Sequence, residues 1–145
     1  MYNYYIRLNA GGKMGTLVEL SNLKILLVEP DPLMADTFYN FFKNNNCFFT
    51  TTKSAEGGAR LLEMQTFDVL ISEHELPEHD GLTFFTGVTG LNSNAVKILI
   101  TNYGDPDPQG SASAVDDIII KPFSFEVFCK VLLRHLKKRG LKATG

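Results

Sequence analysis

The chain has 145 residues, of which 44% are hydrophobic and 21% are charged, and its formal net charge at pH 7 is -2. This length suits one domain, and the composition is that of a folded domain and not of a disordered chain. The small negative charge excludes a general attraction to nucleic acid or to an anionic membrane. No apolar stretch approaches the roughly 20 residues of a membrane span, and the start of the chain lacks a signal-peptide pattern, so we expect a cytoplasmic protein.

Residues 1–22 do not share the pattern of the rest of the chain. They contain several tyrosines, a Gly11-Gly12 pair that interrupts any extended segment, and Met14, which could serve as an internal start. We interpret this stretch as a leader that does not take part in the function, and a vector-encoded origin is one explanation of it. The predicted domain is residues 23–140, followed by a tail at 141–145.

From Lys24 onward, short apolar runs alternate with stretches of helical pattern. The runs predict five strands, at Lys24–Val28, Cys47–Thr51, Val69–Ser72, Val96–Thr101 and Asp117–Ile120. Helices are predicted from Pro32, capped by Asp31, to Asn44; over Ala55–Met64; over Leu82–Val88; and from the Ser124 cap to about Lys138. Where helix four would lie, Gly104–Ala114 contains two prolines and two glycines, so we expect this helix to be short or degraded.

The last predicted helix is amphipathic. Its apolar stripe is expected to face inward and consists of Phe125, Val127, Phe128, Val131, Leu132 and Leu136. Its last turn is basic and contains Arg134, His135, Lys137, Lys138 and Arg139. We interpret this basic cluster as a solvated face that complements the helix dipole, with docking of a partner as the alternative.

Most of the predicted strands are apolar on both faces, as interior strands of a parallel sheet must be, because helices cover both sides. The alternation predicts an α/β fold with a doubly wound five-stranded parallel sheet. In such a sheet, the carboxyl ends of the strands form the crevice that binds ligands. Four of the runs end at Glu29, Glu73, Thr101 and Lys121. Two carboxylates, a hydroxyl and an ammonium are therefore expected to converge at one edge.

From Lys24 to Lys138 the chain resembles a response-regulator receiver domain, the phosphoryl-accepting module of two-component signalling. The resemblance rests on Leu26–Pro32 (LLVEPDP), on the Leu-Pro-x-x-Asp-Gly motif that ends at Gly81, on Thr101, and on Lys121-Pro122-Phe123. It implies a flavodoxin-like fold, a role in signal transduction without enzymatic activity, and a histidine kinase or a downstream effector as the partner. A homodimer is a further possibility that the resemblance leaves open.

The resemblance also assigns the site residues. The family's pair of metal-binding acids falls on Glu29 and Pro30, the phosphoacceptor position on Glu73, and the hydroxyl position on Thr101. The phosphoryl-contacting lysine falls on Lys121, which precedes Pro122 through a bond that is cis in the family. The aromatic switch position falls on Ile118, which has no polar tip and is expected to be a core residue.

Two of these positions depart from the family pattern. Pro30 has no side-chain oxygen for magnesium, and the neighbouring Asp31 is better explained as a helix cap. Glu73 keeps the charge of an aspartate but is longer by one methylene, and a misplacement of about 1 Å can cost about a hundredfold in rate. We therefore predict a phosphorylation-independent pseudo-receiver without a metal or other cofactor, in which Glu73 pairs with Lys121. The pair either fixes an active-like state or is merely structural.

The sequence leaves three other functions as alternatives. A working phosphoacceptor would use Asp31 or Asp80 as a substitute nucleophile. A flavodoxin-like scaffold can host an enzyme or a cofactor, although no nucleotide-binding motif or catalytic triad is present. Nucleic-acid binding through the basic end of the last helix is disfavoured by the overall acidity.

Two smaller groups of residues complete the prediction. His74, Glu75 and His79 lie beside Glu73, but scattered acids and histidines in a loop are expected to be solvated and not to bind a metal. Cys47 and Cys129 are predicted to be buried, reduced thiols, the first in an edge strand and the second in the last helix.

Overall fold

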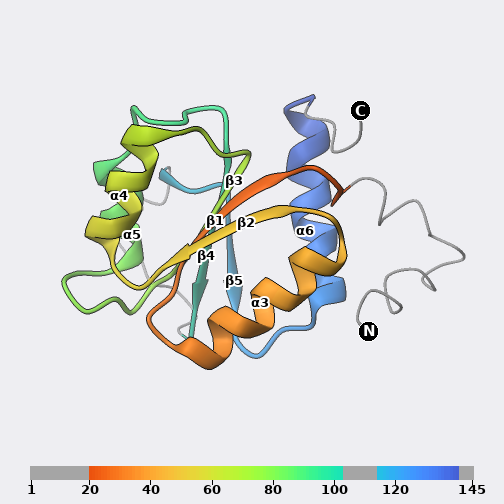
Figure 1. Ribbon diagram of the computed structural model, residues 1–145, viewed down its shortest axis with the longest axis horizontal. Helices are drawn as coiled ribbons and strands as arrows, with labels where there is room; N and C mark the ends of the chain where they lie inside the picture. The colour runs from red at the N-terminus through yellow and green to blue at the C-terminus, as the bar shows by residue number, and fades with distance from the viewer. Residues whose placement is uncertain (1–19, 103–113, 141–145) are drawn as a thin grey trace, which may run out of the picture.

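A parallel sheet of five strands forms the centre of the computed structural model, which describes residues 20–102 and 114–140 (Figure 1). Its strands are β1 (Lys24–Val28), β2 (Phe48–Thr52), β3 (Val69–Glu73), β4 (Val96–Thr101) and β5 (Asp117–Ile120). They lie in the order β2-β1-β3-β4-β5, and every neighbouring pair is parallel. The predicted doubly wound parallel sheet is therefore confirmed, with β2 and β5 as its edges.

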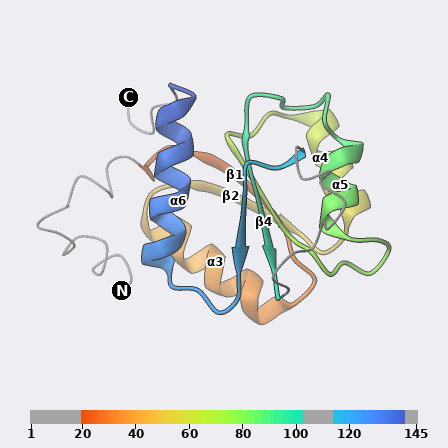
Figure 2. The same cartoon turned by 180° about the vertical axis from the view of Figure 1, so that it is seen from behind.

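Helices cover both faces of this sheet. The four in the described residues are α3 (Pro32–Asn44), α4 (Ala55–Met64), α5 (Gly81–Gly87) and α6 (Phe125–Lys138). α3 and α6 lie on one face and α4 and α5 on the other, as the view from behind also shows (Figure 2). The predicted position of helix four, 104–114, falls outside the described residues except for Ala114. Within the described part of the chain, no helix is long and apolar enough to cross a membrane.

The core is divided by the sheet into two clusters, because successive strand residues point to opposite faces. In β1, Ile25 and Leu27 pack with the phenylalanines of α3 and α6, whereas Leu26 and Val28 pack against α4 and α5. The first cluster also contains Leu20, which is fully buried although it belongs to the predicted leader. Both faces of the central strands are thus dry, which explains their apolar runs.

Helix starts agree with the capping residues seen in the sequence. The side chains of Asp31, Ser54, Asp80 and Ser124 each accept a hydrogen bond from a backbone N–H in the first turn of α3, α4, α5 and α6. Such a cap typically contributes about 1 kcal/mol. The caps place all four helix starts at the carboxyl edge of the sheet, where the candidate site lies.

Several predicted boundaries were wrong by one residue. β2 begins at Phe48 and not at Cys47, because the Cys47 N–H still donates to Phe42 O in the preceding turn. α5 begins at Gly81 and ends at Gly87, one residue earlier at each end, because Asp80 is its cap. Val127, predicted to face inward, is 50% exposed, since Phe128 takes the core position beside it.

Both cysteines are free, as predicted, but the predicted burial is confirmed only for Cys129. Cys129 is buried in α6, whereas Cys47 is half-buried just before β2 and its Sγ donates to Leu20 O at 2.9 Å. Burial raises the pKa of the Cys47 thiol to about 12 and also raises that of Cys129. Neither thiol is therefore an activated nucleophile at neutral pH.

Candidate functional site

Glu73 and Lys121 form an ion pair at the carboxyl edge of the sheet. Glu73 is the last residue of β3 and is 4% exposed. Its Oε1 lies 2.5 Å from Lys121 Nζ, and its Oε2 accepts a hydrogen bond of 3.0 Å from the Glu75 backbone N–H. Both carboxylate oxygens of Glu73 are thus held by groups of the protein itself.

Lys121 is aimed into the site by the backbone that follows β5. Its N–H donates to Thr101 O at 2.8 Å, and the Lys121-Pro122 peptide bond is cis, as the resemblance implied. Burial alone would lower the pKa of the Lys121 ammonium, but its hydrogen bond to Glu73 and the attraction of the nearby carboxylates raise that pKa overall. Lys121 therefore carries its charge throughout the neutral range.

Glu29 supplies a second buried carboxylate. It follows β1, is 3% exposed, and its Oε2 accepts a hydrogen bond of 3.0 Å from the Asp31 backbone N–H. Burial raises the pKa of Glu29 from 4.5 to about 7, and repulsion from Glu73 adds to this effect. In the described residues Lys121 is ion-paired with Glu73 and also attracts Glu29. The raised pKa lets Glu29 hold a proton near neutral pH, which relieves the repulsion between the two acids.

The other predicted acids belong to helix starts. Asp31 is exposed, and its Oδ1 accepts from the Leu33 N–H at 3.1 Å. Asp80 Oδ1 accepts from the Thr83 N–H at 2.7 Å, and these Thr83 hydrogen bonds outweigh desolvation and lower the pKa of Asp80. Pro30 is half-buried between Glu29 and the cap and has no oxygen in its side chain.

Thr101 and Ile118 mark the part of the site next to β5. Thr101 ends β4 and is fully buried, and its register partner in β5 is Ile120. Ile118 is half-buried and packs against the cluster on the α4 and α5 face. It is therefore a packing residue, as expected, although not a fully buried one.

The loop after β3 is more buried than the sequence suggested. His74, expected to be solvated, is 8% exposed; its N–H donates to Ile100 O and its own carbonyl accepts from the Gly81 N–H at 2.7 Å. A Cβ at Gly81 would lie 2.5 Å from Glu73 O, so only glycine allows this close approach. His79 is exposed, as expected. In the described ranges, no three His, Cys, Asp or Glu side chains are grouped as metal ligands.

A second charged cluster lies at the amino end of β5, on the side of the sheet opposite to Glu73 and Lys121. The sequence analysis did not predict it. Arg134 and His135 of α6 contact Asp117 Oδ2 at 2.6 and 2.9 Å, and Arg139 contacts Asp116 Oδ1 at 2.6 Å. The basic end of α6 is therefore not simply a solvated face, because three of its residues bind the start of β5. The Asp116-Asp117 pair beside a basic helix was the available signal.

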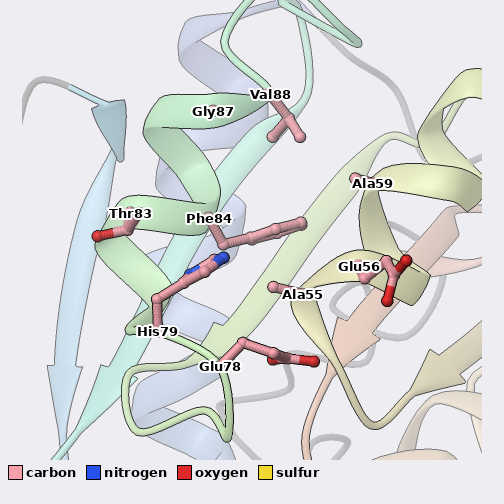
Figure 3. Close-up of a pocket in the computed structure, with 9 residues that line it drawn as sticks. All are labelled: Ala55, Glu56, Ala59, Glu78, His79, Thr83, Phe84, Gly87 and Val88. Carbon is pink, nitrogen blue, oxygen red and sulfur yellow. The ribbon is translucent and has the colours of Figure 1, made fainter.

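A shallow, mostly apolar groove of about 280 Å³ lies between α4 and α5, away from these charges (Figure 3). Phe84 and Val88 of the α5 region face Ala55 and Ala59 of α4 across it, and Glu78 and His79 lie at its end. None of the predicted site residues lines this groove.

Comparison with known proteins identifies the family. The model of the response regulator receiver domain family matches residues 25–133, so the chain belongs to that family. It is 25% identical over 114 residues to the response regulator protein FleR of Pseudomonas aeruginosa, covering 77% of this chain. The chain spans about a quarter of the length of that relative (24%).

Solved structures agree with this assignment. A signal receiver domain of a histidine kinase from Syntrophus aciditrophicus has 27% identity and a TM-score of 0.72, over 85% of this chain and 95% of that one. The response regulator TrrA of Thermotoga maritima, solved with Mg²⁺ and BeF, has 21% identity and a TM-score of 0.69, over 77% and 97% of the two chains. The latter likeness concerns the fold alone.

Proposed function

We propose that this receiver domain signals without phosphorylation, through protein–protein contacts, and that the Glu73–Lys121 ion pair holds its site in one fixed state. The carrying observation is the 2.5 Å contact between Glu73 Oε1 and Lys121 Nζ. It occupies the place where the family's phosphoacceptor and its phosphoryl-contacting lysine would meet a phosphoryl group. The carboxylate of Glu73 takes the ammonium that an incoming phosphoryl group would need.

The charges of the site also oppose phosphoryl transfer. An incoming phosphoryl donor is an anion, and it would approach the buried, ion-paired Glu73 and the buried Glu29, which is partly charged at neutral pH. Catalysis of phosphoryl transfer depends on positioning and on neutralising the developing negative charge. Glu73 is longer than the family's aspartate and is already paired with Lys121. It therefore provides neither the positioning nor the charge neutralisation that phosphoryl transfer needs.

The residues present do not fit the family's magnesium ion. Magnesium requires near-octahedral oxygen coordination, with several oxygen ligands. Pro30 offers no side-chain oxygen, and Asp31 is the cap of α3. One carboxylate oxygen of Glu73 contacts the Lys121 ammonium, and the other accepts a hydrogen bond from the Glu75 backbone N–H. In the described contacts, Glu29 and the exposed Asp31 each keep one carboxylate oxygen without a protein donor, which is fewer ligands than the ion requires.

A substitute phosphoacceptor is not favoured by the positions of the other aspartates. Asp31 and Asp80 each accept a hydrogen bond from the first turn of a helix, so phosphorylation of either would disrupt a cap. Neither is paired with Lys121 in the described contacts. The proposal therefore treats both residues as structural.

The partner of this module belongs to a two-component pathway. Receiver domains interact with histidine kinases and effectors, and we propose that this chain binds such a protein in the cytoplasm, where its two cysteines stay reduced. No catalytic activity is part of the proposal. Since the chain covers a quarter of its curated relative, the function of any longer protein stays a proposal too.

The test compares the wild-type chain with the variant Pro30→Asp/Glu73→Asp, which restores the family's acids. Both are incubated with acetyl phosphate and magnesium, and the incorporated phosphoryl group is measured by intact mass spectrometry. We expect no incorporation into the wild type and measurable incorporation into the double variant. Phosphorylation of the wild type would overturn the proposal, and mapping of the modified residue would show whether Asp31 or Asp80 acts instead.

The fixed state is tested separately with Glu73→Gln. This change keeps the size of the side chain and removes the charge that binds Lys121. We expect altered amide chemical shifts around Thr101 and Lys121 and altered affinity for the partner. Unchanged shifts and unchanged partner binding in a folded variant would show that the pair does not control the state of the domain.

A further inference from the structure

In the described residues, the edge strand β2 has a neighbouring strand on one side only. In the described residues it pairs with β1 alone, and it is the outermost strand of the sheet. The Phe48 N–H donates to Leu23 O, and Thr52 O accepts from the Glu29 N–H, so both residues direct their backbone groups toward β1. In a parallel ladder alternate residues bond to the same neighbour, which places Phe49 and Thr51 with their N–H and C=O groups pointing outward.

Aromatic side chains flank this open side on both faces of the sheet. Phe48 is 62% exposed. Phe49 packs with the cluster under α3, where Tyr39 lies edge-on to its ring at a centroid distance of 6.0 Å, and Tyr39 is itself 39% exposed. Because successive residues of a strand alternate, Phe48 lies on the face opposite Phe49. The edge therefore has partly exposed aromatic side chains above and below the backbone groups that no other described strand pairs.

The strand carries none of the features that usually prevent pairing at an edge. Native edges are protected by charged residues, proline, bulges or short length. β2 has the sequence FFTTT, with neither charge nor proline over five residues. The other edge, β5, begins with the charged residue Asp117 and has four residues.

We propose that β2 pairs antiparallel with β2 of a second copy of this chain, joining the two sheets across a twofold axis. Phe49 then lies opposite Thr51 of the other copy, and each such pair exchanges two hydrogen bonds through the outward backbone groups. Thr50 lies on the axis opposite its own counterpart. A strand without charges is suited to this self-pairing, because identical charged residues near the axis would repel. This inference does not depend on the state of the Glu73 site.

Pairing of one short strand gives a small interface, so the dimer is expected to be weak and reversible. Sedimentation equilibrium of the full chain from about 10 to about 500 µM covers the range expected for such contacts. The variant Thr51→Pro removes one outward N–H and costs no bond to β1, since proline is tolerated on an edge strand with its nitrogen facing out. Thr51→Ser, which keeps the N–H, is the matched control.

We expect the wild type and Thr51→Ser to dimerise with similar affinity, and Thr51→Pro to lose at least tenfold. Amide hydrogen exchange on the wild type gives a second readout that does not require a variant to fold. Protection at Phe49 and Thr51 should rise with protein concentration, whereas Phe48 and Thr50, which bond to β1, should be protected at every concentration. A monomer throughout the range overturns the proposal, and so does a dimer whose formation leaves exchange at Phe49 and Thr51 unchanged.

Discussion

The carboxyl and amino ends of the sheet differ in how their acidic and basic side chains are balanced. At the carboxyl edge, in the part of the chain that the structure describes, two buried acids, Glu29 and Glu73, lie near one ammonium, that of Lys121, which is ion-paired with Glu73. At the amino edge, the carboxylates of Asp116 and Asp117, just before and at the start of β5, bind three basic side chains at the end of α6, and these contacts are 2.6 to 2.9 Å long. The balanced ion pairs at the amino edge connect a strand to a helix. The excess of acidic groups at the carboxyl edge stores electrostatic strain, which is typical of functional positions.

This difference predicts where substitutions and pH act on stability. The carboxyl edge should be sensitive to loss of its single positive charge and to pH near neutrality. The amino edge should be sensitive to acid, because desolvation of Asp116 is outweighed by its bonds to Arg139 and the Lys97 N–H, which lower its pKa. Stability contributed by Asp116 is present above its unfolded pKa and is lost as the pH falls through the lower folded value.

The largest expected effect is that of Lys121→Met. It leaves Glu29 and Glu73 buried without a counter-charge, and loss of one partner of a buried pair costs about 3–5 kcal/mol. Urea denaturation at pH 7 measures the change. The double variant Glu73→Gln/Lys121→Met removes both charges and should recover most of the loss. Equal stability of the single and double variants would mean that the pair is not coupled.

The second effect is a fall in stability as the pH rises. The folded pKa of Glu29, about 7, is above its reference value of 4.5, so the folded state holds a proton that the unfolded chain has released between these values. Stability from this group is complete below about pH 4.5 and is lost through pH 7, by up to about 3 kcal/mol.

Denaturation of the wild type and Glu29→Gln at pH 5, 6, 7 and 8 tests this sign. Glutamine resembles the protonated carboxyl and keeps an acceptor for the Asp31 N–H. The variant should therefore have a flatter profile and be the more stable protein at pH 8. A variant that is less stable at pH 8 would show that the Glu29 carboxylate is favourable where it lies.

A smaller loss is expected at the amino edge from Asp117→Asn. The substitution removes the charge that binds Arg134 and His135, and because Arg134 is more than half exposed the loss should be about 1–2 kcal/mol. It should add to the effect of Glu29→Gln, because the two residues share no contact. Strong non-additivity in a double-variant cycle would mean that the two edges are coupled through the sheet.

The smallest effect tests whether Asp31 acts as a helix cap through its hydrogen bond. Asp31→Asn should leave stability nearly unchanged, because asparagine caps a helix as well as aspartate, whereas Asp31→Ala should lose about 1 kcal/mol. Thermal denaturation of both variants measures the difference. An asparagine variant as unstable as the alanine variant would indicate that the charge of Asp31, and not its hydrogen bond, matters.

Much of this organisation could be predicted from local patterns. The runs at Lys24–Val28 and Val96–Thr101 are apolar on both faces, and Ser54 and Ser124 precede helical stripes, so strands and caps followed from the sequence alone. The resemblance supplied the Glu73–Lys121 pair, whose partners are far apart in sequence.

Features that depend on tertiary contacts were not predicted. The burial of His74 results from backbone bonds to β4 and to the start of α5. The ion pairs between the end of α6 and the start of β5 could not be predicted either, because sequence periodicity does not show that Arg139 and Asp116 lie close together. The edge position of β2, by contrast, was predicted from the sequence, and the strand order confirms it.

The most direct test of the central claim is an amide NMR titration of the full chain with magnesium, followed by magnesium with beryllofluoride. Pro30→Asp/Glu73→Asp serves as the responsive control. If the site is held by its own Glu73–Lys121 pair, the wild-type spectrum stays unchanged while that of the variant shifts. Shifts in the wild type clustered at Glu29, Glu73, Thr101 and Lys121 would mean that a metal and phosphoryl site survives, and would contradict the account.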